Sequence, residues 1–203
     1  MKNRRDAVWL LIGGLALLLT AGCGTTPPTR FYQLTSQTLA DADRKPLPGL
    51  AIGVGPVRLA DYLGRPQIVK RENNNKLQIE EFDRWGGALE NNITWVVAEN
   101  LSQLLGTDAV IAFPWERAIV PDYQVAIDVR RLDSTDAKQV DLIALWQILD
   151  ADGRGLLSIN RSDISEQMVD PGVSALVAAQ SRALSRMCVE IATAIRSHQA
   201  QKK

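Results

Sequence analysis

The sequence contains little of what most catalytic and metal-binding sites require. It has 203 residues but only one histidine, His198, and two cysteines, Cys23 and Cys188. With one histidine near the C-terminus, a Ser-His-Asp or Cys-His arrangement has no positioned base, and a metal site built from several histidines is excluded. We therefore expect no enzyme activity, no cofactor and no metal.

The sequence also lacks an excess of charge and a long apolar run. Its formal net charge is zero, and removal of the first 22 residues leaves it slightly acidic, so we expect no nucleic-acid partner. The longest apolar run, Val8 to Leu19, is shorter than the ~20 residues that span a bilayer. A permanent transmembrane helix is therefore not predicted.

The N-terminus has the order of a secretory signal peptide. Basic residues within Met1–Arg5 precede the apolar run, and the small residues Ala21 and Gly22 follow it. Cys23 comes directly after them, and Thr20-Ala21-Gly22-Cys23 resembles the lipobox of bacterial lipoproteins, with Thr20 where leucine is usual. The resemblance implies cleavage of residues 1–22, an S-diacylglycerol on Cys23 and an N-acyl group such as palmitate. The alternative is an ordinary signal peptide with a chance cysteine.

If Cys23 carries lipid, Cys188 has no partner for an intramolecular disulfide. Residues 23–29 form a tether that contains Pro27 and Pro28, and Thr25 to Thr29 reach roughly 15–20 Å. We expect a domain over residues 30–197 and a frayed tail over residues 198–203. Cys188 lies on the apolar side of a helical pattern, which predicts a core residue.

Hydropathy periods predict an α+β fold. Extended patterns occur around residues 30–34, 50–57, 67–71, 76–82, 109–113, 123–130, 140–149 and 156–165. Helical periods cover about 85–105, which Gly106 ends, and about 172–196. We expect these two main amphipathic helices to cover one face of a mostly antiparallel sheet.

The strand predicted at residues 140–149 is apolar on both faces. Val140, Leu142 and Trp146 share one face, whereas Ile143 and Leu145 lie on the other. Such a strand is either covered on both sides or part of a contact surface.

Three motifs resemble functional sites but have simpler explanations. Gly53-Val54-Gly55 lacks the third glycine of a dinucleotide loop, because Arg58 stands there, and close packing of a strand explains it better. Residues 150–155 begin like a calcium loop but place Arg154 at an oxygen-ligand position, so we predict a hairpin turn. Glu80, Glu81 and Asp83 form an acidic group that a solvated strand end explains.

Several blocks together resemble a known family. They are Phe31-Tyr32-Gln33-Leu34, Gly55 to Leu63 with the sequence GPVRLADYL, and Glu99 to Leu105 with the sequence ENLSQLL. With the lipobox, they resemble the PqiC/YmbA family of ABC-type transport auxiliary lipoproteins. The resemblance implies a non-catalytic lipoprotein of the outer membrane that faces the periplasm and works with a mammalian cell entry (MCE) transport protein in lipid transport and membrane integrity. Gly24, rather than aspartate, is compatible with outer-membrane sorting.

Within this interpretation, Asp61, Tyr62, Leu63 and Arg65 are a candidate partner-contact loop, because tyrosine and arginine are common at interface hot spots. The alternative is that Tyr62 and Leu63 pack the domain. Because MCE assemblies are ring-like, a homo-oligomeric ring is a further hypothesis. Two other functions stay open: a lipid carrier that holds acyl chains between sheet and helices, and, with the least support, a hydrolase that uses Asp or Glu.

Overall fold

A computed structural model describes residues 27–37, 45–73, 75–115, 119–135 and 138–202. Signal peptide, Cys23 and the first half of the tether lie outside these residues. The elements, in chain order, are β1 (Arg30–Tyr32), β2 (Ile52–Leu59), the 3-10 turn η2 (Asp61–Leu63), β3 (Gln67–Asn73), β4 (Lys76–Trp85), α2 (Leu89–Leu105), β5 (Val110–Ala112), β6 (Tyr123–Thr135), β7 (Gln139–Leu149), β8 (Leu156–Gln167) and α3 (Val173–Gln201).

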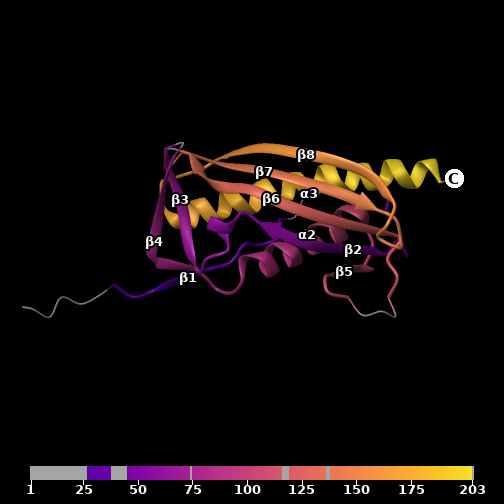
Figure 1. Cartoon of the computed structure of the whole chain (residues 1–203), viewed down its shortest axis with the longest axis horizontal. Coiled ribbons are helices and arrows are strands. Elements are labelled where there is room, and N and C mark those ends of the chain that lie inside the picture. The colour runs from indigo at the N-terminus through magenta and orange to yellow at the C-terminus, as the bar shows by residue number, and fades with distance from the viewer. Residues whose placement is uncertain (1–26, 38–44, 74, 116–118, 136–137, 203) are drawn as a thin grey trace, which may run out of the picture.

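The eight strands form one sheet that forks at β6 (Figure 1). One edge of β6 pairs with β7, which in turn pairs with β8, and these two longest pairings are antiparallel. The other edge of β6 is shared. Its first part pairs with β2, whereas at its far end Thr135 pairs with Arg71 of β3. One arm of the fork therefore continues to β5 and the other continues through β4 to β1.

The predicted α+β class is confirmed, and both helices pack on the same face of the sheet. Alternate residues of β7, from Val140 to Ile148, are at most 3% exposed and belong to the same core as Leu101 of α2 and Leu184 of α3. Figure 1 shows α3 lying along the long axis behind β6, β7 and β8. Parallel pairings of β2 with β5 and β6, and of β1 with β4, make the sheet mixed.

Helix α2 ends where the sequence predicts, but it starts four residues later. Gly106 adopts the left-handed conformation, with φ 64°, and its N–H donates to Ser102 O. Trp85 belongs to β4 and not to the helix, because its N–H donates to Pro66 O and it pairs with Tyr32 of β1.

The two faces of β7 differ in their burial. Ile143 and Leu145 are half-buried on the helix-free face, beside the charged neighbours Arg131 and Arg161 in the adjacent strands. The inner face is core. The strand is therefore central in its sheet and covered by helices on one side.

The glycines of Gly53-Val54-Gly55 allow close packing, as the sequence predicts. A Cβ atom added at Gly53 would lie 2.9 Å from the Trp115 ring, and one at Gly55 would lie 2.5 Å from Phe113 Cβ. The residues after β5 thus approach β2 at a place where any side chain would obstruct them.

The C-terminal segment differs from the expected frayed tail, because α3 continues to Gln201. Tertiary contacts hold the last turns of this helix against the rest of the domain. Arg196 donates to the carbonyls of Lys45 and Leu104, Tyr123 Oη donates to Gln199 Oε1 at 3.1 Å, and His198 Nε2 lies 3.2 Å from Ser158 Oγ.

Candidate functional site

The acidic group in β4 differs in part from the solvated strand end that the sequence predicts, because Glu81 is exposed but Glu80 is half-buried and Asp83 is buried. Asp83 is only 2% exposed, and both of its carboxylate oxygens accept hydrogen bonds of 2.7 Å from Arg30. These bonds hold the pKa of Asp83 below its ordinary value. Glu80 pairs with Lys70. Asp83 and Glu80 therefore help to attach β1 and β3 to β4.

The turn after β7 is the hairpin that the sequence predicts. The Asp150 carboxylate accepts hydrogen bonds from the backbone N–H groups of Arg154 and Gly155, which lower its pKa. In the described ranges, no three Asp, Glu, His or Cys residues are grouped so that they could hold a metal ion.

The predicted contact loop is a single 3-10 turn between β2 and β3. Leu63 N–H donates to Ala60 O at 2.8 Å, and Gly64 N–H donates to Asp61 O at 3.2 Å. The Leu63 side chain is 5% exposed and belongs to the core. Leu63 therefore anchors the turn to the domain.

Tyr62 is held by a carboxylate inside the protein. Its hydroxyl donates to Asp133 Oδ2 at 2.6 Å, and the Arg71 guanidinium lies 5.8 Å from the centre of its ring. Asp133 is fully buried and also accepts hydrogen bonds from Arg71 and Arg131. Burial, with the hydrogen bond to Asp133, raises the pKa of Tyr62. The structure thus gives Tyr62 and Leu63 the packing role that was the alternative interpretation.

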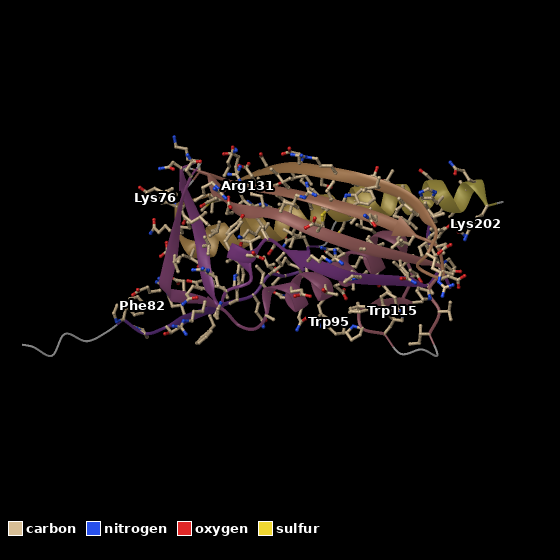
Figure 2. The ribbon with its side chains drawn as sticks, in the orientation of Figure 1. Lys76, Phe82, Trp95, Trp115, Arg131 and Lys202 are labelled. Carbon is tan, nitrogen blue, oxygen red and sulfur yellow. The ribbon has the colours of Figure 1, made fainter. Side chains whose placement is uncertain are left out.

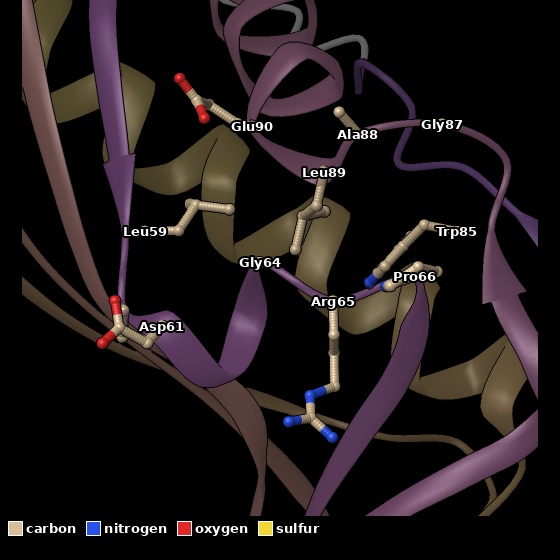
Figure 3. A pocket seen from close by; sticks show the side chains of 11 residues that line it. Leu59, Asp61, Gly64, Arg65, Pro66, Trp85, Gly87, Ala88, Leu89 and Glu90 are labelled. Atoms are coloured by element: carbon tan, nitrogen blue, oxygen red, sulfur yellow. The ribbon is translucent and has the colours of Figure 1, made fainter.

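Asp61 and Arg65 differ from these two residues because they line a groove. The groove has a volume of about 650 Å³ and is open to solvent (Figure 3). In Figure 3, Leu89 lies between Leu59 and Asp61 on one side and Trp85 on the other. The remaining lining residues are Ala60, Gly64, Pro66, Gly87, Ala88 and Glu90.

Two features leave hydrogen-bonding capacity in this groove. The Nε atom of Arg65 is buried but has no hydrogen-bond partner among the described residues. Ala88, at the start of α2, has no side-chain oxygen to cap the first N–H groups of the helix. Carboxylate or carbonyl oxygens of a partner would suit the first N–H groups of the helix, whereas the Nε atom of Arg65 is closed to solvent and would reach a partner only after the side chain moved.

The sequence did not reveal that the end of β4 and the start of α2 form the opposite wall of this groove. Trp85, Leu89 and Glu90 lie twenty or more residues from the loop in sequence. The available signal is Gly86-Gly87, which separates a strand pattern from a helix pattern and allows a sharp change of direction.

Cys188 is the buried core residue that the sequence predicts, and burial raises its pKa to about 12. Cys23, the predicted lipid attachment site, lies outside the described residues. Among the described helices, none is both long enough and apolar enough to cross a bilayer.

Comparison with known proteins identifies a family and a fold. The sequence pattern of a family described as "ABC-type transport auxiliary lipoprotein component" matches residues 32–192. A crystal structure of a protein from Xanthomonas campestris is 18% identical, with a TM-score of 0.70, over 86% of this chain and 100% of that one. A second, described only as an uncharacterized protein, is 17% identical, with a TM-score of 0.68, over 83% of this chain and 99% of that one. No curated protein matches the sequence.

Proposed function

Because this chain belongs to the family of ABC-type transport auxiliary lipoprotein components, we propose that it is a non-catalytic accessory of an MCE-type intermembrane lipid transport system. In this proposal it is held at the outer membrane by acyl groups on Cys23, faces the periplasm and docks the transport tube to that membrane. The observation that carries the proposal is the family match, which covers most of the chain.

The tether limits where the domain works. Only six residues separate Cys23 from Arg30, the first residue of β1, which is at most about 25 Å of extended chain. This length cannot cross a periplasm, so the transport partner must supply the bridge between membranes. The lipoprotein then acts as a docking point beside its own membrane.

We place the partner contact in the groove between η2 and the start of α2. Its lining combines the apolar side chains of Leu59 and Leu89 with the charged side chains of Asp61, Arg65 and Glu90. Interface hot spots combine an apolar, desolvated centre with a polar surround in this way. Trp85 pairs with Tyr32 of β1, so the groove lies near the tether and would hold a partner close to the membrane.

The lipid-carrier alternative has less support. The layer between sheet and helices is occupied by core side chains such as Ile52, Val125, Leu142, Leu176 and Met187, which are fully buried. An acyl chain in that layer would have to displace them. The groove is open to solvent and is lined by charged as well as apolar groups.

The anchor is tested by Cys23→Ser in the full-length protein. Loss of the thiol prevents diacylglycerol attachment, so we expect the protein to leave the membrane fraction and to incorporate no labelled palmitate. Cys188→Ser is the matched control, because that thiol is buried, and it should stay in the membrane fraction. Retention of the Cys23→Ser protein in membranes would show that another segment anchors it.

The groove is tested by co-purification of the full-length lipoprotein with the MCE-domain protein. We expect the double change Asp61→Ala and Arg65→Ala to weaken binding by about 30-fold, as for loss of about 2 kcal/mol at a hot spot. Arg130→Ala, at an exposed arginine of β6, is the control.

Both proteins should unfold at the temperature of the unsubstituted chain, because neither change touches the core. Equal binding by all three proteins would remove the groove as the contact site while leaving the family function intact.

A further inference from the structure

An exposed phenylalanine stands where the tether enters the domain. Phe31 is 67% exposed, although it lies in β1. The neighbouring Arg30 is itself 63% exposed, but its guanidinium binds the buried Asp83 and so holds this side chain against the domain. Successive side chains of a strand point to opposite sides, so Phe31 points away from the domain.

An exposed cation lies beside this ring. Arg84 of β4 is the register partner of Phe31 and is exposed. Arg30–Asp83 and Lys70–Glu80 form pairs. Arg84 makes no such pair with any residue in the part of the chain that the structure describes. An apolar ring beside a free guanidinium is the combination that favours the boundary between lipid headgroups and acyl chains.

The length of chain before β1 keeps this pair close to the anchor. Seven residues separate Cys23 from Phe31, which is at most about 28 Å of fully extended chain. Pro27 and Pro28 lack backbone N–H groups, so they cannot continue the pairing of β1 along β4. The tether therefore leaves the sheet at this end, and Figure 2 shows Phe82 of β4 there as well.

We propose that the end of the domain formed by β1 and the last residues of β4 rests on the phospholipid surface, with Phe31 in the interface and Arg84 at lipid phosphates. The inference rests on the proposed anchor at Cys23. The anchor supplies the affinity, and this contact supplies orientation. The opposite end of the long axis, where α3 ends, then points away from the membrane (Figure 1).

Spin labels measure this orientation in the processed full-length protein, reconstituted into vesicles of phosphatidylethanolamine and phosphatidylglycerol. A nitroxide is attached at Phe31→Cys and, as a matched control, at Val120→Cys. Val120 is 66% exposed and lies three residues before β6, which starts at the other end of the long axis in Figure 1. Cys188 is buried and protonated, so it does not compete for the label.

We expect the label at position 31 to collide severalfold less often with a water-soluble nickel complex, and more often with oxygen, than the label at position 120. Changing Arg84 to Glu should reduce that difference. Quenching by brominated lipids of the fluorescence that Phe31→Trp or Val120→Trp adds to that of the native tryptophans, with the unsubstituted protein as reference, gives a second measurement that needs no label.

Flotation with the vesicles distinguishes a failure of the Phe31 contact from a failure of the lipid anchor. If the protein floats and the two labels are equally exposed to water, the contact at Phe31 does not exist. If both labels are shielded, the molecule lies along its length and the end-on orientation is wrong. If the protein does not float, the anchor itself fails, and both proposals fall.

Discussion

Asp133 joins two parts of the sheet that share almost no backbone pairing. The arm that holds β3, β4 and β1 meets β6 through one pair of residues, Arg71 and Thr135. The buried carboxylate of Asp133 accepts hydrogen bonds from Tyr62, Arg71 and Arg131, which come from three segments. A buried carboxylate is costly without such donors, so the cluster must form as a unit.

Tyr62→Phe removes one donor from this cluster while keeping the ring. We expect the free energy of unfolding to fall by about 1.5–3 kcal/mol, the usual range for a hydrogen bond to a charged group, as measured by urea denaturation. Asp61→Asn is the control, because the Asp61 side chain is exposed.

Unchanged stability of Tyr62→Phe would bear on the candidate contact site. If Tyr62→Phe unfolds like the unsubstituted protein but co-purifies poorly with the proposed MCE-domain partner, the tyrosine is a contact residue and the sequence-based hypothesis is right.

At the scale of elements, two glycines of β2 allow the residues after β5 to pack closely against that strand. Gly55 has φ +121°, which side chains rarely adopt, and its Cβ position is blocked by Phe113. Gly53 faces the Trp115 ring. The GxG spacing therefore serves packing between segments.

Gly55→Ala combines backbone strain with a steric clash. We expect a loss of about 2–4 kcal/mol in the free energy of unfolding, since overpacking and an unfavourable φ each cost about 1–3 kcal/mol. Gly87→Ala is the matched control, because no atom lies within 4 Å of its Cβ position and its φ is not positive. Similar urea midpoints for the two variants would show that Phe113 moves aside freely.

The sequence predicted the elements better than their arrangement. Periodicity identified α2, α3 and the strands because each buries one face, and Gly106 marked a helix end that depends only on local backbone geometry. The fork at β6 and the parallel pairing of β1 with β4 depend on partners distant in sequence, which no local period encodes. The tail was mispredicted because its helix is stabilised by tertiary hydrogen bonds such as those of Arg196.

The same distinction holds for the candidate site. The loop was found from its sequence, but the sequence does not show whether its tyrosine and leucine face a partner or the core of the domain. Only the position of Asp133, far along the chain, assigns Tyr62 to the inside. The groove is formed by two segments, and the sequence identified only the loop after β2, not the end of β4 and the start of α2.

At the scale of the whole molecule, the outermost strands carry information about assembly. Among the described residues, β8 pairs only with β7, and β5 pairs only with β2. The start of β8 exposes three large apolar residues, Leu156, Leu157 and Ile159. A long, exposed strand edge with apolar side chains tends to pair with another chain unless it is protected.

These two edges differ from one another, as contacts that close a ring require. We expect the full-length protein in density-matched detergent to sediment as an oligomer at micromolar concentration. Ile159→Lys, which puts a charge beside the β8 edge, should shift it toward the monomer. Leu77→Lys is the control, because Leu77 is also exposed but lies on β4 in the other arm of the fork. If the unsubstituted protein stays monomeric across micromolar concentrations, the ring hypothesis is wrong. The proposed ring-like transport partner would then bind single copies of this protein, each held by its own tether and groove.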